Sequence, residues 1–202
     1  MMVKFKPHKF YEHHQRDRKK FSKLENNDAL QPWMAAIFSD YSENWKLRSD
    51  RSCTVEEYRK MPDASLMNTC CFLVPNNSVI RIDCHNISND SKHDTCLSPK
   101  NFELIIADLL SRYPQIKHIE ITTDTAPKEY KAVSVFVRVG KLSVKFKISI
   151  LMSTFGSGHG KFIHDPSGKI WLNEYNKNCV GNLGPKAANL ENTADYMNQN
   201  FF

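Results

Sequence analysis

The sequence predicts an α+β fold in which N-terminal helices pack on a curved, mainly antiparallel, cone-shaped sheet. Apolar residues at helical spacing run through 29–45, and strictly alternating apolar residues run through much of 129–175. Spacings of three and four are typical of a helix, whereas a period of two is typical of a half-buried strand. Helices early in the chain, followed by a long block of strands, are the order expected of an α+β domain.

Local signals define the elements of the first half. Asp28 and the asparagines before it offer an N-cap to the helix at 29–45, and Pro32 falls in its first turn, where a missing N–H costs nothing. Thr54 and Glu57 have the spacing of a capping box. The first half is therefore predicted to contain helices over about 10–24, 29–45 and 54–60, then strands over 70–74 and 78–84 around the turn 75–77.

The second half is predicted to begin with a helix and to continue as a meander of strands. Ser98-Pro99 starts that helix and Tyr113-Pro114 ends it. The predicted strands are 117–124, then two strands joined at Gly140-Lys141, then one that follows the turn 165–168 and ends at Trp171-Leu172. After Tyr175 the chain is polar, with one helical turn expected near 194–198.

Composition predicts one soluble, cytoplasmic domain with no membrane partner. Of the 202 residues, 41% are hydrophobic, which is enough for a core, and no apolar run approaches the roughly 20 residues of a membrane span. The N-terminus lacks the apolar region of a secretory signal. The expected organisation is a basic arm at 1–25, a domain at 26–176 with a polar insertion near 46–97, and a polar tail at 177–202.

The charge and the cysteines constrain the partners only weakly. The net charge is +6, and cations concentrate in the N-terminal arm, which could contact phosphate or simply be solvated. The six cysteines form no Cys-x-x-Cys pair, so reduced thiols are expected.

Three segments of the second half carry a resemblance to a known family. These are the Tyr-Pro turn at 113–116, the Ala-Val-Ser-Val segment at 132–135, and Ser-Gly-Lys-Ile at 167–170 before Glu174-Tyr175. In this order they resemble a SnoaL-like domain, the polyketide-cyclase branch of the nuclear transport factor 2-like, cystatin-like superfamily. Residues 27–40 are similar to the paired opening helices of that family. The resemblance implies a cystatin-like cone around an apolar cavity.

The resemblance also implies a function, namely a small-molecule-binding domain. If it is an enzyme, it would be an isomerase, cyclase or dehydratase that transfers protons without a cofactor. His164 or His118 would be the base and Tyr175 the hydrogen-bond donor, because an apolar cavity moves such pKa values toward working pH. A small apolar or carbonyl-bearing ligand and a homodimer through the sheet are the expected partners, and no metal is expected. The ligand-binding residues, which could equally be core, would be Trp33, Phe38, Tyr41, Trp45 and Trp171.

Two alternatives stay open. A nucleic-acid- or protein-binding module would use the basic arm and a basic sheet face that carries Arg138, Lys141, Lys145 and Lys147 beside Phe136. A metal-dependent nuclease would bring together two alternating pairs on neighbouring strands, Asp83 with His85 and His118 with Glu120. Solvated sheet faces with cross-strand charge pairs are the favoured explanation of both sets. A zinc site from Cys84-His85 and His93-x-x-Cys96 is disfavoured, since neighbours on a strand point apart.

Overall fold

The structure is a computed structural model that describes residues 30–42, 44–47, 54–76, 78–90, 92, 95–124, 130, 132–154, 164–179 and 190–200. The predicted helix at 10–24 and the basic arm lie outside the described residues. Strands are β1 (Met34–Tyr41), β2 (Trp45–Lys46), β3 (Asp63–Leu73), β4 (Ile80–Ser88), β5 (His118–Thr123) and β6 (Ser149–Thr154). Helices are α2 (Val55–Lys60), α3 (Leu97–Arg112), α4 (Val133–Phe146), α5 (His164–Glu174), the π-helical turn η1 (Tyr175–Cys179) and α6 (Leu190–Asn200).

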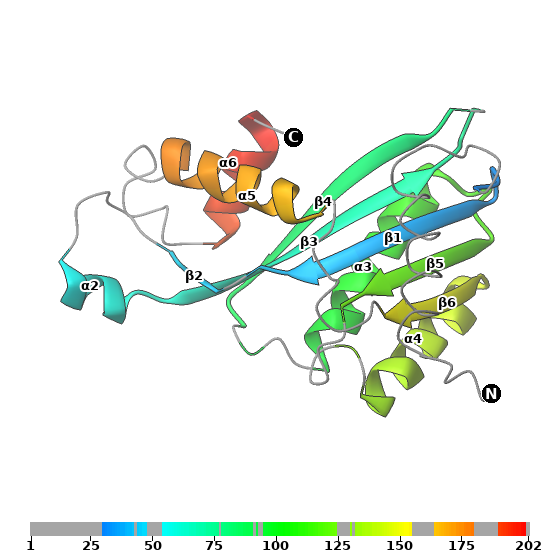
Figure 1. Ribbon diagram of the computed structural model, residues 1–202, viewed down its shortest axis with the longest axis horizontal. Helices are drawn as coiled ribbons and strands as arrows, with labels where there is room; N and C mark the ends of the chain where they lie inside the picture. Colours follow the sequence, from blue (N-terminus) through cyan, green and yellow to red (C-terminus); the bar gives the residue numbers. More distant parts are fainter. Residues whose placement is uncertain are drawn as a thin grey trace, which may run out of the picture.

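The strands form one open, mixed sheet, which confirms the α+β class. Across the sheet the order is β4-β3-β1-β5-β6, and β2 pairs with the start of β3. β1, β3 and β4 pair antiparallel, whereas β5 and β6 continue the sheet parallel to β1. The carboxyl ends of β1, β5 and β6 therefore lie at one edge of the sheet (Figure 1).

Helices cover both faces of the sheet. α3 and α4 pack on one face, where the largest core cluster joins β1 and β5 residues such as Ile37 and Ile121 to Phe102 and Val135. α5, η1 and α6 lie over the other face, beside the long β3–β4 pair (Figure 1). Their cluster contains Trp171, Tyr175 and Met197. Among the described residues, no helix combines the length and apolar character needed to cross a membrane.

The helix predicted at 29–45 is wrong, because residues 34–41 form the central strand β1. Residues 35–39 are buried in succession, since β3 and β5 flank the strand and side chains cover both of its faces. A strand buried on both faces shows a continuous apolar run rather than alternation. The periodicity of such a run does not distinguish a strand from a buried helix.

The strands predicted on either side of Gly140 are also wrong, because this segment is helix α4. Its buried residues are Val135, Val139 and Leu142, at spacings of four and three. Valine occurs at every second position from 133 to 139, and two of these valines, Val135 and Val139, also have the four-residue spacing of a helix face. The other two, Val133 and Val137, are exposed on the helix. In the described part of this block the one strand is β6, which begins after the left-handed residue Lys147 that ends the helix.

The closing hairpin predicted at 165–172 is helix α5. Pro166 stands in its first turn, where proline is well tolerated. Trp171 and Tyr175 are four residues apart, so the helical turn puts both on the buried side. The segments 132–135 and 167–170, on which the SnoaL-like resemblance depends, are therefore helical. The resemblance itself stays a prediction.

The remaining elements confirm the local signals. α2 begins with the predicted capping box, in which Thr54 and Glu57 hydrogen-bond reciprocally. α3 ends at Tyr113 as predicted, and β5 occupies the predicted strand at 117–124. The two strands around 75–77 are β3 and β4, longer than predicted, so much of the stretch 46–97 belongs to the sheet. The helical turn expected near 194–198 is part of α6.

Candidate functional site

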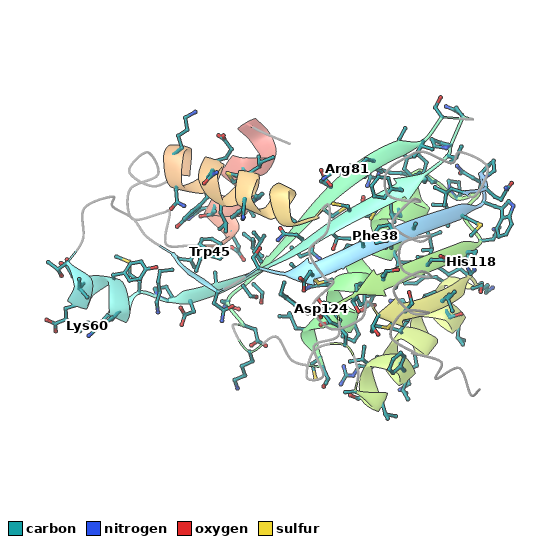
Figure 2. All side chains as sticks on the ribbon, in the orientation of Figure 1. Phe38, Trp45, Lys60, Arg81, His118 and Asp124 are labelled. Carbon is teal, nitrogen blue, oxygen red and sulfur yellow. The ribbon has the colours of Figure 1, made fainter. Side chains whose placement is uncertain are left out.

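Two aspartates stand together where the parallel strands end. β1 and β5 pair in parallel register up to Ser39 and Thr123, and the next residues along the two chains are Asp40 and Asp124. Neighbouring strands lie about 4.8 Å apart, and residues in register point to the same face. Both side chains are half-buried. Figure 2 shows Asp124 at the tip of β5.

The row of polar residues continues across the antiparallel half of the sheet. Asp40 pairs in register with Asn68 of β3, and Asn68 pairs with His85 of β4. We call His85, Asn68, Asp40 and Asp124 the polar row. Apolar residues flank it along the strands, with Phe38 and Cys70 on one side and Leu66 on the other. Buried polar side chains in such a row are costly unless they are hydrogen-bonded.

Hydrogen bonds fix the members of the polar row. Asn68, only 2% exposed, donates from Nδ2 to the Ser42 hydroxyl at 2.6 Å. Its Oδ1 lies 3.0 Å from His85 Nδ1. Because Oδ1 can only accept, the proton must be on His85 Nδ1, and Nε2 is the acceptor nitrogen. One oxygen of Asp40 accepts the backbone N–H of Tyr41 at 2.8 Å.

Helix α5 closes over the polar row at a glycine. A Cβ at Gly168 would lie 2.2 Å from Asn68 Nδ2, so no side chain fits between the helix and β3. One turn later, the Trp171 ring lies 6.4 Å from the His85 ring and stacks on Tyr175 at 6.0 Å. These rings also contact Trp45. The aromatic cluster thus shields one end of the polar row from water.

Burial keeps His85 neutral. Desolvation under α5 lowers the pKa of His85 to about 4, the positive charge of Arg81 adds to this, and the Asp83 carboxylate opposes it. At neutral pH the imidazole is therefore a hydrogen-bond donor to Asn68 rather than a cation. The negative charge of the polar row is confined to its Asp40–Asp124 end.

The alternative predicted bases, His164 and His118, and the predicted hydrogen-bond donor, Tyr175, belong to three different elements. His118 starts β5 at the end of the sheet opposite Asp124 (Figure 2), half-buried, with Nε2 3.7 Å from Glu120. Tyr175 is buried at the start of η1 beneath α6. His164 is the first residue of α5, and its side chain is outside the described part. A catalytic role for any of them stays a prediction.

The predicted ligand-binding aromatics are also divided. Phe38 and Tyr41 lie on opposite faces of β1 and belong to different core clusters, whereas Trp33 is 49% exposed. Only Trp45 and Trp171 meet, in the cluster with Tyr175. Side chains of β1 and α4 pack into the same core where the ligand cavity was expected.

The predicted metal constellation does not form. Asp83 and His85 are on β4, and His118 and Glu120 are on β5, but β3 and β1 stand between those strands. Three strand spacings separate them by about 14 Å, too far for shared ligation. Within the described ranges, no three His, Cys, Asp or Glu side chains converge as a metal site. Of the proposed zinc ligands, His93 is outside those ranges, and adjacent Cys84 and His85 face opposite sides.

Asp40, Asn68 and Asp124 escaped the sequence reasoning. A signal was present, because Asp40 follows the largely apolar run Ala-Ala-Ile-Phe-Ser and Asp124 follows the β-branched, strand-like run Ile-Glu-Ile-Thr-Thr. Carboxylates at strand ends are informative only when both runs are read as parallel strands. The helical interpretation of 29–45 removed Asp40 from consideration.

Comparison with known proteins gives a family but no activity. The sequence model of one family, described as a domain of unknown function (DUF8701), matches residues 18–192. No curated protein matches the chain. Among solved structures, the chain is similar to the foamy viral protease-reverse transcriptase in complex with dsDNA, with 11% identity and a TM-score of 0.33. That match covers 77% of this chain and 94% of the viral chain.

Proposed function

The chain belongs to the DUF8701 family of unknown function, and we propose that it hydrolyses phosphodiester bonds of nucleic acid with a divalent cation bound at Asp40 and Asp124. The observation that carries this proposal is the register of β1 and β5, which puts two carboxylates side by side at the carboxyl ends of parallel strands. In open sheets with parallel strands, ligands bind beyond this edge, where connections diverge in opposite directions.

The residues present fit a small, hard cation. Mg²⁺ prefers oxygen ligands and is commonly held by one or two carboxylates, with waters and substrate phosphate completing its shell. Among the described residues no third His, Cys, Asp or Glu converges with these two carboxylates, so the pair matches the requirement of Mg²⁺ and not that of zinc, which needs three or four protein ligands. Asp40 and Asp124 are half-buried, so both residues remain partly exposed to solvent.

When bound, the cation would supply charge neutralisation at a phosphodiester and a more acidic water. The protein contributes the positions of the oxygens. Asp40 is held by the N–H of Tyr41. Asn68 fills the neighbouring register position as a neutral amide, since Ser42 and His85 engage both ends of it. Neutral His85 adds no positive charge that would compete with a cation.

The charge of the chain favours a polyanionic substrate. Lys and Arg exceed Asp and Glu by six residues. A net positive charge attracts nucleic acid, while a local carboxylate pair would repel it unless a cation is bound. A phosphodiester in a strand supplies both the phosphate for the cation and further phosphates for basic side chains.

A cleavage assay tests the proposal. The purified chain is incubated with end-labelled single-stranded and duplex DNA and RNA, with Mg²⁺, Mn²⁺ or EDTA. We expect cleavage that requires the cation and falls by about 100-fold or more in Asp40→Asn and in Asp124→Asn, because losing even an outer-shell partner costs 10–100-fold. Glu120→Gln is the matched control, because Glu120 lies on the same face of β5 four residues before Asp124, and it should retain cleavage. Equal activity in all variants, or no activity on any substrate, would refute the proposal.

A further inference from the structure

A groove lined mainly by cations lies between α3 and α4. Its volume is about 330 Å³. We call it the α3–α4 groove. Its charged lining is Lys100 and Glu103 of α3 with Arg138, Lys141 and Lys145 of α4, and its other lining residues are Cys96, Pro99 and Leu142. Four positive side chains and one carboxylate give this small surface a strong positive potential.

Two of the four cations are already paired, and two are not. Glu103 accepts hydrogen bonds from Lys145 and from Lys100, the latter at 3.1 Å, and these lysines lower the pKa of the Glu103 carboxyl. Arg138 and Lys141 have no ion-pair partner among the described side chains. The groove therefore holds unneutralised charge beside a carboxylate that keeps two lysines in place.

The cations of α4 form a line rather than a point. Arg138, Lys141 and Lys145 follow at spacings of three and four, so they share one side of the helix. Seven residues of helix extend about 10 Å. A line of charge of this length matches successive phosphates of a strand better than a single phosphate. Leu142 and Pro99 supply an apolar floor for the sugars between them.

The α3–α4 groove and the aspartate pair lie on opposite sides of the sheet. Asn101, next to Lys100, donates from Nδ2 to the Tyr41 hydroxyl at 3.1 Å. Tyr41 directly follows Asp40 at the end of β1. Side chains of successive strand residues point to opposite faces, so α3 covers the face opposite the one that carries the Asp40 side chain.

We infer that the α3–α4 groove binds the phosphate backbone of a nucleic-acid strand, with Arg138 and Lys141 as its free phosphate contacts and Glu103 limiting its affinity. This inference goes beyond the proposed function, because it assigns a nucleic-acid-binding surface on the side of the sheet opposite the aspartate pair. It does not depend on whether the chain cleaves that strand, because binding is measured without a cation.

Salt-dependent binding provides the test. The full chain is titrated into a labelled single strand of about 20 nucleotides in EDTA, and fluorescence anisotropy is followed between about 50 and 200 mM KCl. Two lost phosphate contacts should reduce the slope of log affinity against log salt by about 1.4. The affinity of the wild type should therefore fall between about 50 and 200 mM KCl by a factor about sevenfold larger than the affinity of Arg138→Gln/Lys141→Gln does. At low salt this variant should bind the strand more weakly than the wild type. The control, Arg59→Gln/Lys60→Gln on exposed α2, changes the charge equally and should leave slope and affinity unchanged.

A variant that is expected to bind the strand more tightly distinguishes a lost phosphate contact from misfolding. Glu103→Gln removes the one carboxylate among the described lining residues of the groove, so it should bind the strand more tightly and with a steeper salt slope. Unchanged binding in the Arg138/Lys141 variant, or weaker binding in Glu103→Gln, would overturn the inference. Equal affinity for polyglutamate, with the same dependence on these residues, would overturn the assignment to nucleic acid.

The same titration distinguishes the failure of the two proposals. Asp40→Asn/Asp124→Asn should bind the strand as tightly as the wild type in EDTA, since the groove is intact. If that variant still cleaves, the proposed function fails while the groove stands. If the wild type cleaves but the Arg138/Lys141 variant binds normally, the groove fails while the proposed function stands.

Discussion

Protonation of His85 should make the fold acid-sensitive in a defined pH window. The pKa of His85 is about 4 in the folded protein, because α5 buries the ring, and 6.5 is its ordinary value when unfolded. Below pH 6.5 the unfolded chain binds a proton that the folded chain refuses, so stability falls as the pH falls from 6.5 to 4. A pKa difference of 2.5 units, at about 1.4 kcal/mol per unit, predicts a loss of about 3 kcal/mol by pH 4.

Urea unfolding of the wild type and of His85→Gln measures this loss. Tryptophan fluorescence is a suitable signal, since Trp171 lies beside His85. Glutamine retains a donor for Asn68 but does not titrate, so other groups contribute alike to both proteins and cancel in the difference. We expect the gap in unfolding free energy to shift by about 3 kcal/mol in favour of His85→Gln between pH 7 and pH 4. If the unfolding free energies of the two proteins changed with pH in parallel, the His85 ring would not be desolvated under α5.

Two further predictions test the helices that replaced the expected strands. Val135→Lys should lower the free energy of unfolding by about 3 kcal/mol or more, because it buries a charge, whereas Val137→Lys should change it by less than about 0.5 kcal/mol. Equal effects would indicate that 133–139 is a strand, because a strand puts both residues on one face. Gly168→Ala should cost about 1–3 kcal/mol through its collision with Asn68, whereas Gly140→Ala, which meets nothing within 4 Å, should stabilise α4 by about 0.8 kcal/mol. Urea denaturation measures all four, and a stabilising Gly168→Ala would contradict the close approach of α5.

Elements marked by their own end signals were predictable from the sequence. α2 and α3 were located because a capping box, a Ser-Pro start and a Tyr-Pro stop are local chemistry. β3, β4 and β5 were found because they combine β-branched residues with a turn or a clear boundary. Each of these signals depends on neighbours in the chain and not on what packs against the element.

Elements decided by tertiary packing were not predictable. β1 is buried on both faces, so its Ala-Ala-Ile-Phe core has no period that identifies a strand. α4 is rich in valine, yet Val135, Val139 and Leu142 meet α3 and the sheet only as a helix. The candidate site shares this limit, since Asp40 and Asp124 are 84 positions apart in the sequence and meet only through the register of β1 and β5.

The most direct test of the central claim is a calorimetric titration of Mn²⁺ into the metal-free chain. The aspartate pair predicts one saturable cation site that is lost in Asp40→Asn and in Asp124→Asn. Asp83→Asn, which belongs to the constellation that β3 and β1 divide, should bind Mn²⁺ as the wild type does. Undiminished binding in both strand-end variants, or loss of binding in Asp83→Asn alone, would contradict a cation site at the ends of β1 and β5.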